Sequence, residues 1–305
     1  MAAPPRSCRY AYVCGVASRR EGCTAGTRDD GWNDGKSAAD FEERVNAFIR
    51  ERHAEGHGTL RSVESALLTR EEVLAVRLYS GPAYQPINGF LRQLASLRGD
   101  FRTQLAQHAD FTFSATVGHL CHAIRKLTSV ATPQEARQQL WRGVRGELPR
   151  GFWIPDEQGM IVAVEMGFTS TSRNRQTPLS YMGSGETNIL WQLHPQLESD
   201  VGYHYGADIT LLSQFAREEE VLFPPCTMFS LLVDRAPRPE APTAVPATLA
   251  EAQQAAGGSY QSNMPMPSQQ WRLDQRTQEL QMSVYPVERE GDKEFRCLAV
   301  TPTFL

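Results

Sequence analysis

The spacing of apolar residues changes near residue 140, from a helical period to a pattern typical of β-strands. Upstream, Phe41, Val45, Phe48 and Ile49 recur at the spacing that places apolar side chains on one face of a helix. Four more helices are predicted: one after the capping box Thr69–Glu72 and stopping at Gly81, then Pro86–Leu97 stopping at Gly99, Ser114–Leu127, and one that starts at Thr132 with Pro133 at its first position.

Downstream of residue 140, short runs rich in β-branched and aromatic residues predict strands. The predicted strands are Gln139–Val144, Ile161–Thr171, Asn188–Leu193, Ile209–Leu212, Glu218–Phe223 and Thr227–Val233. A closing hairpin is predicted from Leu280–Val287 and Glu294–Thr301, joined through a turn at Gly291. Helices first and strands after predict an α+β fold.

Two stretches lack any period, and they divide the chain. Residues 1–38 predict a disordered leader, and residues 236–268, rich in Pro, Ala, Gln and Ser, predict a flexible excursion. The remainder is expected to form a single domain over residues 39–305. Its predicted parts are a helical part 39–137, a β core 138–235, the excursion 236–268 and a closing hairpin 269–305.

Composition and charge argue against some classes of function and leave the compartment open. The net charge of −4 argues against a broad nucleic-acid surface, and no run approaches the ~18 apolar residues of a membrane span, so a soluble protein is expected. The six cysteines form no CxxC pair, which leaves the disulfide state open. The arginine-rich first twenty residues permit a transit segment, and Tyr10–Ala17 permits a weak signal peptide. An untargeted leader is preferred to both, which slightly favours the cytoplasm.

The most informative polar feature is the run Glu218–Glu220, which leads directly into the apolar residues Val221–Phe223. In a strand, Glu218 and Glu220 would share one side and Glu219 the other. Two neighbouring carboxylates resist joint ionisation unless a cation lies between them. A solvated charge run is the alternative, but the apolar residues that follow favour a site on a buried strand.

Together with two upstream segments, this run resembles the arginine-specific mono-ADP-ribosyltransferases. That family carries an Arg on a first core strand, a Ser-Thr-Ser on a second and a Glu-x-Glu on a later one. The counterparts here are Arg142, Ser170-Thr171-Ser172 and Glu218-x-Glu220. The family also places an aromatic residue three positions before the first Glu, and Phe215 stands there.

The resemblance covers roughly residues 70–235 and includes the stretch Tyr79–Arg92, which looks like the helical segment preceding the family's NAD-binding core. It implies an N-terminal helical segment packed on a mixed β-sandwich that binds NAD. It also implies the transfer of ADP-ribose from NAD to arginine side chains of an acceptor protein. Expected partners are therefore NAD and a protein with an exposed arginine, without nucleic acid and without a metal.

The resemblance also implies a role for each residue at the NAD. Arg142 would bind the phosphates, while the backbone of Gly143 would lie against the nicotinamide amide. Ser170 would donate a hydrogen bond to Glu220, and Glu220 would accept one from the nicotinamide ribose. Thr171 and Ser172 complete the predicted cofactor-binding strand, and Tyr181 is the expected aromatic residue over the nicotinamide.

On the acceptor side, Glu218 would orient the guanidinium and take its proton, because a guanidinium with a pKa of about 12.5–13.8 is a poor nucleophile. Phe215 is expected to contact the acceptor. Two alternatives remain open: an NAD glycohydrolase that uses the same pocket, and a non-catalytic binding module of the same fold. The histidine pair His53 and His57 does not have the pattern of a zinc helix.

Overall fold

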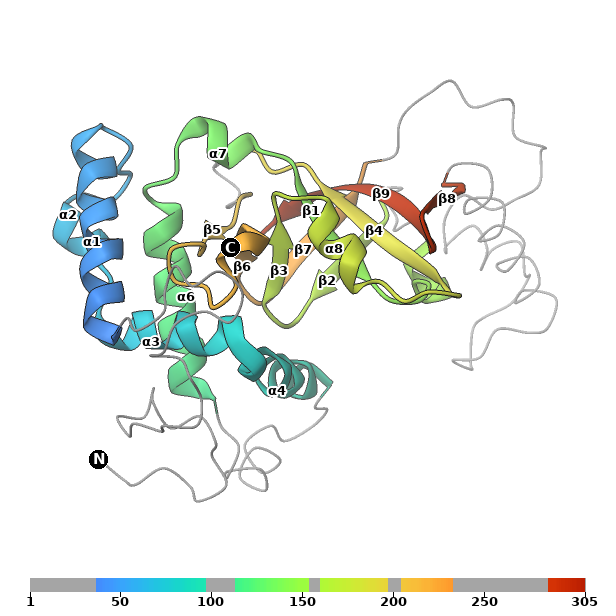
Figure 1. Ribbon diagram of the computed structural model, residues 1–305, viewed down its shortest axis with the longest axis horizontal. Helices are drawn as coiled ribbons and strands as arrows, with labels where there is room; N and C mark the ends of the chain where they lie inside the picture. The colour runs from blue at the N-terminus through green and yellow to red at the C-terminus, as the bar shows by residue number, and fades with distance from the viewer. Residues whose placement is uncertain (1–36, 97–112, 154–159, 197–203, 233–284, 305) are drawn as a thin grey trace, which may run out of the picture.

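The computed structural model describes residues 37–96, 113–153, 160–196, 204–232 and 285–304. Helices gather on one side of the molecule and strands on the other (Figure 1). The predicted excursion lies outside the described residues, and so does the predicted leader apart from residues 37 and 38. Within the described ranges, no helix combines the length and the apolar character that crossing a membrane requires.

The helical part confirms the predicted order of helices. Its elements are α1 (Ala38–Ala54), α2 (Val63–Ala66), α3 (Arg70–Leu78), η2 (Tyr79–Ala83), α4 (Tyr84–Ser96), α6 (Ser114–Thr128) and α7 (Pro133–Arg137). The predicted capping box forms, with Thr69 and Glu72 capping α3, and the helix start predicted at Thr132 is also a capping box, formed with Glu135. In each, a hydroxyl and a carboxylate satisfy backbone N–H groups that the first turn of a helix leaves without partners.

The predicted stop at Gly81 takes an unexpected form. Helix α3 ends earlier, at Leu78, and the chain continues into the π-helical turn η2, where Gly81 has non-helical backbone angles. A Cβ at Gly81 would come within 2.3 Å of Nε2 of Gln214. Glycine is therefore required here by the close approach of a segment more than a hundred positions downstream.

The strands form one nine-stranded mixed sheet, with the order β2-β7-β9-β4-β1-β3-β6-β5 and β8 paired to β9. Their bounds are β1 (Leu140–Val144), β2 (Val162–Glu165), β3 (Thr169–Ser172), β4 (Thr187–Leu193), β5 (Ala207–Asp208), β6 (Glu220–Phe223), β7 (Thr227–Leu231), β8 (Val287–Glu290) and β9 (Lys293–Thr303). Short helices η4 (Arg150–Trp153), α8 (Gln176–Tyr181) and η5 (Ala216–Glu218) connect them. The α+β prediction is confirmed.

Two strand predictions are wrong in detail. The run Ile161–Thr171 is two strands, β2 and β3, which pair with different neighbours. The run Ile209–Leu212 is a turn rather than a strand, because the N–H groups of Leu212 and Ser213 both donate to the carbonyl of Ile209. The strand in this region is the two-residue β5, just before that turn.

A closing hairpin forms from β8 and β9, which pair antiparallel around Gly291. Its first strand begins at Val287, where the predicted strand Leu280–Val287 was expected to end, and residues 280–284 lie outside the described residues. Gly291 has a φ of 60°, a left-handed conformation that glycine adopts without steric cost. Strand β9 continues into the sheet and lies parallel to β4, so the end of the chain is part of the core.

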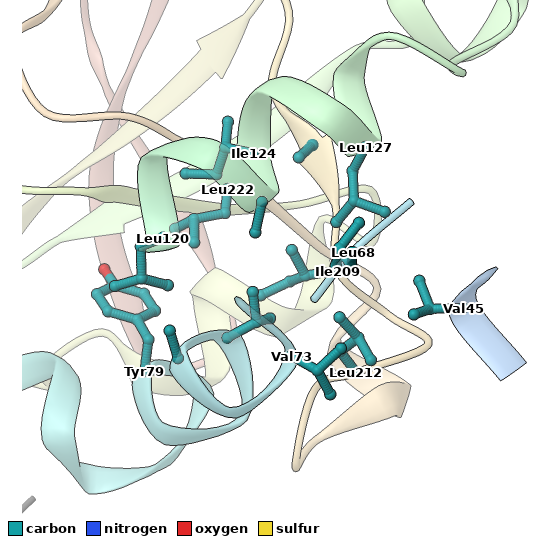
Figure 2. Close-up of a cluster of buried hydrophobic side chains, with 14 of the residues drawn as sticks. Val45, Leu68, Val73, Tyr79, Leu120, Ile124, Leu127, Ile209, Leu212 and Leu222 are labelled. Atoms are coloured by element: carbon teal, nitrogen blue, oxygen red, sulfur yellow. The ribbon is translucent and has the colours of Figure 1, made fainter. Parts of the chain in front are cut away.

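Alternate residues of β6 point into two hydrophobic clusters. Leu222 belongs to the cluster between the helices and the sheet, which Figure 2 shows together with residues of α3 and α6 such as Val73 and Leu120. Val221 and Phe223 belong to a second cluster in the β core. Strand β6 is therefore buried on both faces, and this fixes the position of Glu220 at its first residue.

Candidate active site

The three predicted segments lie on adjacent strands. Strand β3 pairs antiparallel with β6, with Ser172 opposite Glu220, and on its other side pairs with β1, with Trp141 opposite Ser172. Residues directly opposite one another in an antiparallel pair share a face of the sheet, and so do residues two apart in one strand. Ser170, Ser172 and Glu220 therefore lie on one face, although fifty positions separate the two strands.

Glu220 is the most perturbed carboxyl group of this site. Its side chain is 6% exposed. Its pKa is raised to about 7, chiefly by burial and also by the negative charge of Glu218, while Ser170 and the positive charge of Arg142 oppose the shift. Ser170 thus favours the ionised form of Glu220, and a direct hydrogen bond between the two stays a prediction.

The prediction that Glu218 lies on the same strand as Glu220 is wrong. Glu218 ends the 3-10 helix η5, Glu219 follows with a left-handed φ of 49°, and strand β6 begins only at Glu220. Strand alternation therefore does not place the two carboxylates side by side. The charge of Glu218 nevertheless contributes to the raised pKa of Glu220 across the turn at Glu219.

The hydroxyl groups of the Ser-Thr-Ser strand divide between two tasks. Ser170 favours the ionised form of Glu220. Thr171 donates to the carbonyl of Val221 at 2.7 Å, and Ser172 donates to the carbonyl of Glu218 at 2.6 Å. The latter two hydroxyls hold β6 and the turn before it, so in this state they bond backbone; contact of these residues with a cofactor stays a prediction.

Gly143 allows helix α8 to lie against β1. A Cβ at this position would come within 2.9 Å of the Pro178 carbonyl oxygen and 3.2 Å of Met182 Cε. Leu179 and Met182 pack there in a small apolar cluster with Trp141 at its edge. Any larger residue at Gly143 would push α8 away from the strand.

Tyr181, the last residue of α8, lies on the side of the site that faces Glu218. Its ring is 57% exposed, and its hydroxyl donates a hydrogen bond to Oε1 of Glu218. Its carbonyl accepts from Nε of Arg145 at 2.9 Å. Sequence reasoning placed an aromatic residue here but did not foresee its contact with Glu218.

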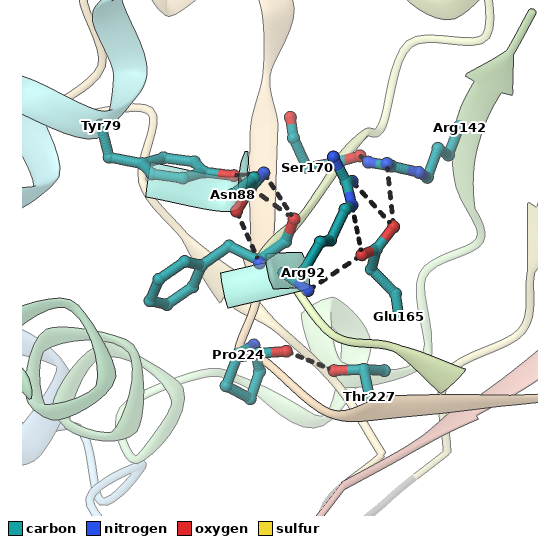
Figure 3. A network of polar contacts seen from close by, with 10 residues as sticks. Tyr79, Asn88, Arg92, Arg142, Glu165, Ser170, Pro224 and Thr227 are labelled. Atoms are coloured by element: carbon teal, nitrogen blue, oxygen red, sulfur yellow. Dashed lines mark hydrogen bonds and ion pairs between the residues drawn. The ribbon is translucent and has the colours of Figure 1, made fainter. Parts of the chain in front are cut away.

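Arg142 lies at the edge of the same site and shares a carboxylate with a second arginine (Figure 3). Its guanidinium donates to the Ser170 carbonyl at 2.8 Å and lies 3.9 Å from Oε2 of Glu165. Arg92 binds both oxygens of Glu165 at 3.0 Å. Burial lowers the pKa of Arg142, and the charge of Glu165 works against that shift.

Glu165 is a residue that sequence reasoning missed. Burial raises its pKa, but hydrogen bonds from Arg92 and from the Gly167 amide outweigh burial, and the net pKa is lowered. It therefore stays ionised between two guanidinium groups. Sequence pattern could not identify Glu165, because its ion pair with Arg92 forms only when helix α4 lies beside strand β2.

The segment Tyr79–Arg92 is attached to the start of strand β3 through Asn88 (Figure 3). The Asn88 amide accepts from the N–H of Phe168 at 2.9 Å and donates to its carbonyl at 3.2 Å, and it also donates to the Tyr79 hydroxyl. A Cβ on Gly167 would lie only 2.8 Å from the Asn88 oxygen. The predicted helical segment is thus a support for the Ser-Thr-Ser strand.

Phe215 precedes the first residue of η5 and is half-buried. Its N–H donates to Ser213 Oγ at 3.0 Å. The charged residues of the loop after β3 are paired with acids: Arg173 with Asp208, and Arg175 with Glu290. Within the described part of the chain, no group of three or more potential ligands is placed to hold a metal ion.

A family model described as NAD:arginine ADP-ribosyltransferase matches residues 37–240. Among solved structures, ADP-ribosyltransferase HopU1 of Pseudomonas syringae pv. Tomato DC3000 is 16% identical, with a TM-score of 0.44, and the match covers 98% of this chain and 100% of that one. ADP-ribosyltransferase Vis in complex with agmatine is 18% identical, with a TM-score of 0.40 and 85% of each chain covered.

The eukaryotic mono-ADP-ribosyltransferase ART2.2, as its E189I mutant in complex with NAD, is 13% identical, with a TM-score of 0.39 and coverage of 87% of this chain and 77% of that one. No curated protein matches the sequence.

Proposed function

Since this chain belongs to the NAD:arginine ADP-ribosyltransferase family, we propose that it transfers ADP-ribose from NAD to arginine side chains of an acceptor protein and releases nicotinamide. The observation that supports this most is the environment of Glu220. It is a buried carboxyl group whose pKa responds to Ser170, to the positive charge of Arg142 and to a second carboxylate, Glu218.

Glu220 is suited to stabilise the sugar cation. Breaking the bond between nicotinamide and ribose develops positive charge on the ribose, as in glycoside hydrolysis. An ionised Glu220 accepts a hydrogen bond from the ribose 2′-hydroxyl and stabilises that charge, and a preorganised group of this kind contributes about 10²–10³ in rate. Because the pKa of Glu220 is about 7 in the free protein, only part of the protein holds the carboxylate form at neutral pH. The positive charge on the nicotinamide of bound NAD favours that active, ionised form.

Arg142 is the proposed ligand of the NAD phosphates. Its guanidinium cannot lose its charge at neutral pH, and its planar fork matches phosphate oxygens. The bond to the Ser170 carbonyl holds the arginine beside the strand that bears Ser170. The family resemblance adds that the backbone of Gly143 lies against the nicotinamide amide and that Tyr181 covers the ring.

Glu218 is the proposed contact for the acceptor. A guanidinium must be oriented and must lose a proton to attack the sugar, and a nearby carboxylate does both. Glu218 is partly exposed at the end of η5, which supports its access to an acceptor. Phe215 is the proposed apolar contact of that acceptor.

An assay with labelled NAD and an arginine-bearing acceptor such as agmatine tests this function. We expect transfer by the wild-type protein, and loss of both transfer and NAD hydrolysis in Glu220→Ala. Glu218→Gln is expected to abolish transfer while NAD hydrolysis persists, because water requires no second carboxylate to orient it.

Glu219→Gln is the matched control. It makes the same chemical change at an exposed position between the other two, and it should leave transfer and hydrolysis as in the wild type. Absence of transfer by the wild type, or equal loss of transfer and hydrolysis in Glu218→Gln, would contradict the proposal.

A further inference from the structure

The contact between Tyr181 and Glu218 joins the cofactor side of the site to the acceptor side. The Tyr181 hydroxyl donates to Oε1 of Glu218, although the two residues belong to different elements, α8 and η5. We propose that Tyr181 is a positioning residue that fixes the Glu218 carboxylate for the acceptor guanidinium and so favours arginine over water. This inference rests on the proposed function.

Tyr181 is held in place independently of Glu218. Gly143 lets α8 lie against β1, and Met182, the next residue, is buried at that contact. Nε of Arg145 donates to the Tyr181 carbonyl at 2.9 Å. The phenol therefore reaches Glu218 from a backbone position that packing determines, rather than by chance contact of two free side chains.

The whole segment 173–186, which contains α8, is also attached to the C-terminal hairpin at both ends. At its start, Arg175 pairs with Glu290, and Gln176 donates to the same carboxylate at 2.9 Å. At its end, Ser184 donates to Asp292 at 2.6 Å. These contacts limit how far α8, and with it Tyr181, can move along the sheet.

The backbone of Glu218 is fixed from the opposite side. Ser172 Oγ donates to its carbonyl at 2.6 Å, and its N–H donates to the Phe215 carbonyl at 3.0 Å. What remains variable is the side chain of Glu218, whose rotamers cost conformational entropy to restrict. The Tyr181 hydroxyl bonds its carboxylate and thereby restricts that freedom before an acceptor arrives.

The chemistry of a carboxylate explains why this favours a guanidinium. The phenol donates to Oε1 and so fixes the plane of the carboxylate, and a planar guanidinium can donate to a carboxylate only when the two planes match. A hydrogen bond from a neutral donor to a carboxylate is charge-assisted and therefore stronger than one between neutral groups. Water needs no such orientation, so loss of the phenol should weaken transfer more than hydrolysis.

Tyr181→Phe tests this inference, because it removes only the hydroxyl and keeps the ring. With agmatine as acceptor, we expect the KM for agmatine to rise and the ratio of transfer to NAD hydrolysis to fall by about tenfold, as loss of a hydrogen bond to an ion predicts. Ser180→Ala is the matched control: it removes an exposed hydroxyl from the same helix, one that bonds only the Thr177 carbonyl, and should leave the ratio unchanged.

A double-mutant cycle shows whether Tyr181 acts through Glu218. In a Glu218→Gln background, Tyr181→Phe should lower the residual ratio by much less than tenfold, because the carboxylate that the phenol orients is already gone. Tyr181→Leu, which also removes the ring, should lower hydrolysis as well as transfer.

The outcomes separate this inference from the function on which it rests. If the wild-type protein hydrolyses NAD but transfers nothing to agmatine or to an arginine-rich protein, the proposed function fails. If the wild type transfers ADP-ribose and Tyr181→Phe keeps the ratio within about twofold, or lowers transfer and hydrolysis equally, the role of Tyr181 is overturned.

Discussion

Two segments enclose the candidate site, and they are held by different kinds of contact. The loop 209–219, here called the acceptor loop after its proposed role, carries Phe215 and Glu218. The segment 173–186, here the α8 segment, carries Tyr181. Buried hydrogen bonds hold the first to the helical part, whereas apolar packing against β1 holds the second, which also forms a partly exposed ion pair with the C-terminal hairpin.

The acceptor loop is held chiefly by Arg77 of helix α3, whose side chain is fully buried. Its guanidinium donates to the carbonyls of Leu212 and Ser213 at 2.9 and 3.1 Å and lies 4.0 Å from the centre of the Phe41 ring. In return, Gln214 donates to the Arg77 carbonyl at 2.7 Å. If the loop moved away from α3, the buried Arg77 guanidinium and the loop carbonyls would lose their hydrogen-bond partners, so the loop is strongly held.

The polar contacts of the α8 segment include the ion pair of Arg175 with Glu290, whose side chains are 33% and 38% exposed. Water competes for both charges of such a pair, so the pair contributes little to stability. The apolar packing of Leu179 and Met182 against β1 holds α8 in place. The comparison indicates that buried polar contacts hold the acceptor loop, whereas apolar packing, rather than the ion pair, holds the α8 segment.

The largest expected effect on stability is at the acceptor loop. Arg77→Met should lower the free energy of unfolding by about 3 kcal/mol or more, because two buried carbonyls lose their partners and each costs about 1–3 kcal/mol. Urea denaturation measures this. Arg70→Met, an exposed change on the same helix, is the control and should cost less than about 0.5 kcal/mol. An equal loss of unfolding free energy in Arg77→Met and Arg70→Met would show that buried hydrogen bonds do not hold the acceptor loop.

The next largest effect concerns Glu220, where the two segments meet. Its pKa is about 7 in the folded protein against 4.5 for an ordinary glutamate, so folding favours the protonated form. This contribution to stability is complete below about pH 4.5 and is lost as the pH rises through 7, with a total on the order of 3 kcal/mol. Glu220→Gln should therefore gain stability relative to the wild type between pH 5 and pH 8, as thermal unfolding measures; a constant difference between the two would count against the raised pKa.

The same titration predicts a pH–rate profile, because Glu220 must be ionised to stabilise a sugar cation. The kcat/KM for NAD should rise with pH and level off above about 7. The corresponding limb of kcat should lie at lower pH, since bound NAD places positive charge beside the carboxylate.

The smallest effect is expected at the ion pair of the α8 segment. Glu290→Gln should leave the urea midpoint of unfolding nearly unchanged and raise the KM for NAD about two- to threefold, because water already competes for the pair. High salt should reduce the difference between the two proteins, because it screens a pair that only the wild type has. Glu288→Gln, two residues earlier on the same strand, is the control; a tenfold change in KM for Glu290→Gln would mean that the ion pair, and not apolar packing, holds the α8 segment.

Much of the fold could be predicted from the sequence. The helical period, the capping boxes at Thr69 and Thr132 and the turn at Gly291 are local signals, and local signals determine local structure. The site strands were also predictable, because Val221–Phe223 is apolar enough to be buried on both faces.

The errors and omissions have a shared physical cause. Glu219 adopts a left-handed backbone conformation, but this position holds neither glycine nor asparagine, the residues that usually indicate such a turn. The turn at Ile209 has the apolar composition of a strand. Glu165 is bound by Arg92, which is more than seventy positions away. Such pairs have no counterpart in local sequence pattern.

The sequence by itself determined which residues are available for chemistry and the order of the elements that carry them. The tertiary structure alone decided that Glu218 leaves the strand, that Tyr181 bonds it and that Glu220 is buried enough to hold a proton near neutral pH. The reason is physical: residue type and period act within a few positions, whereas desolvation and hydrogen-bond geometry depend on groups that only folding brings together.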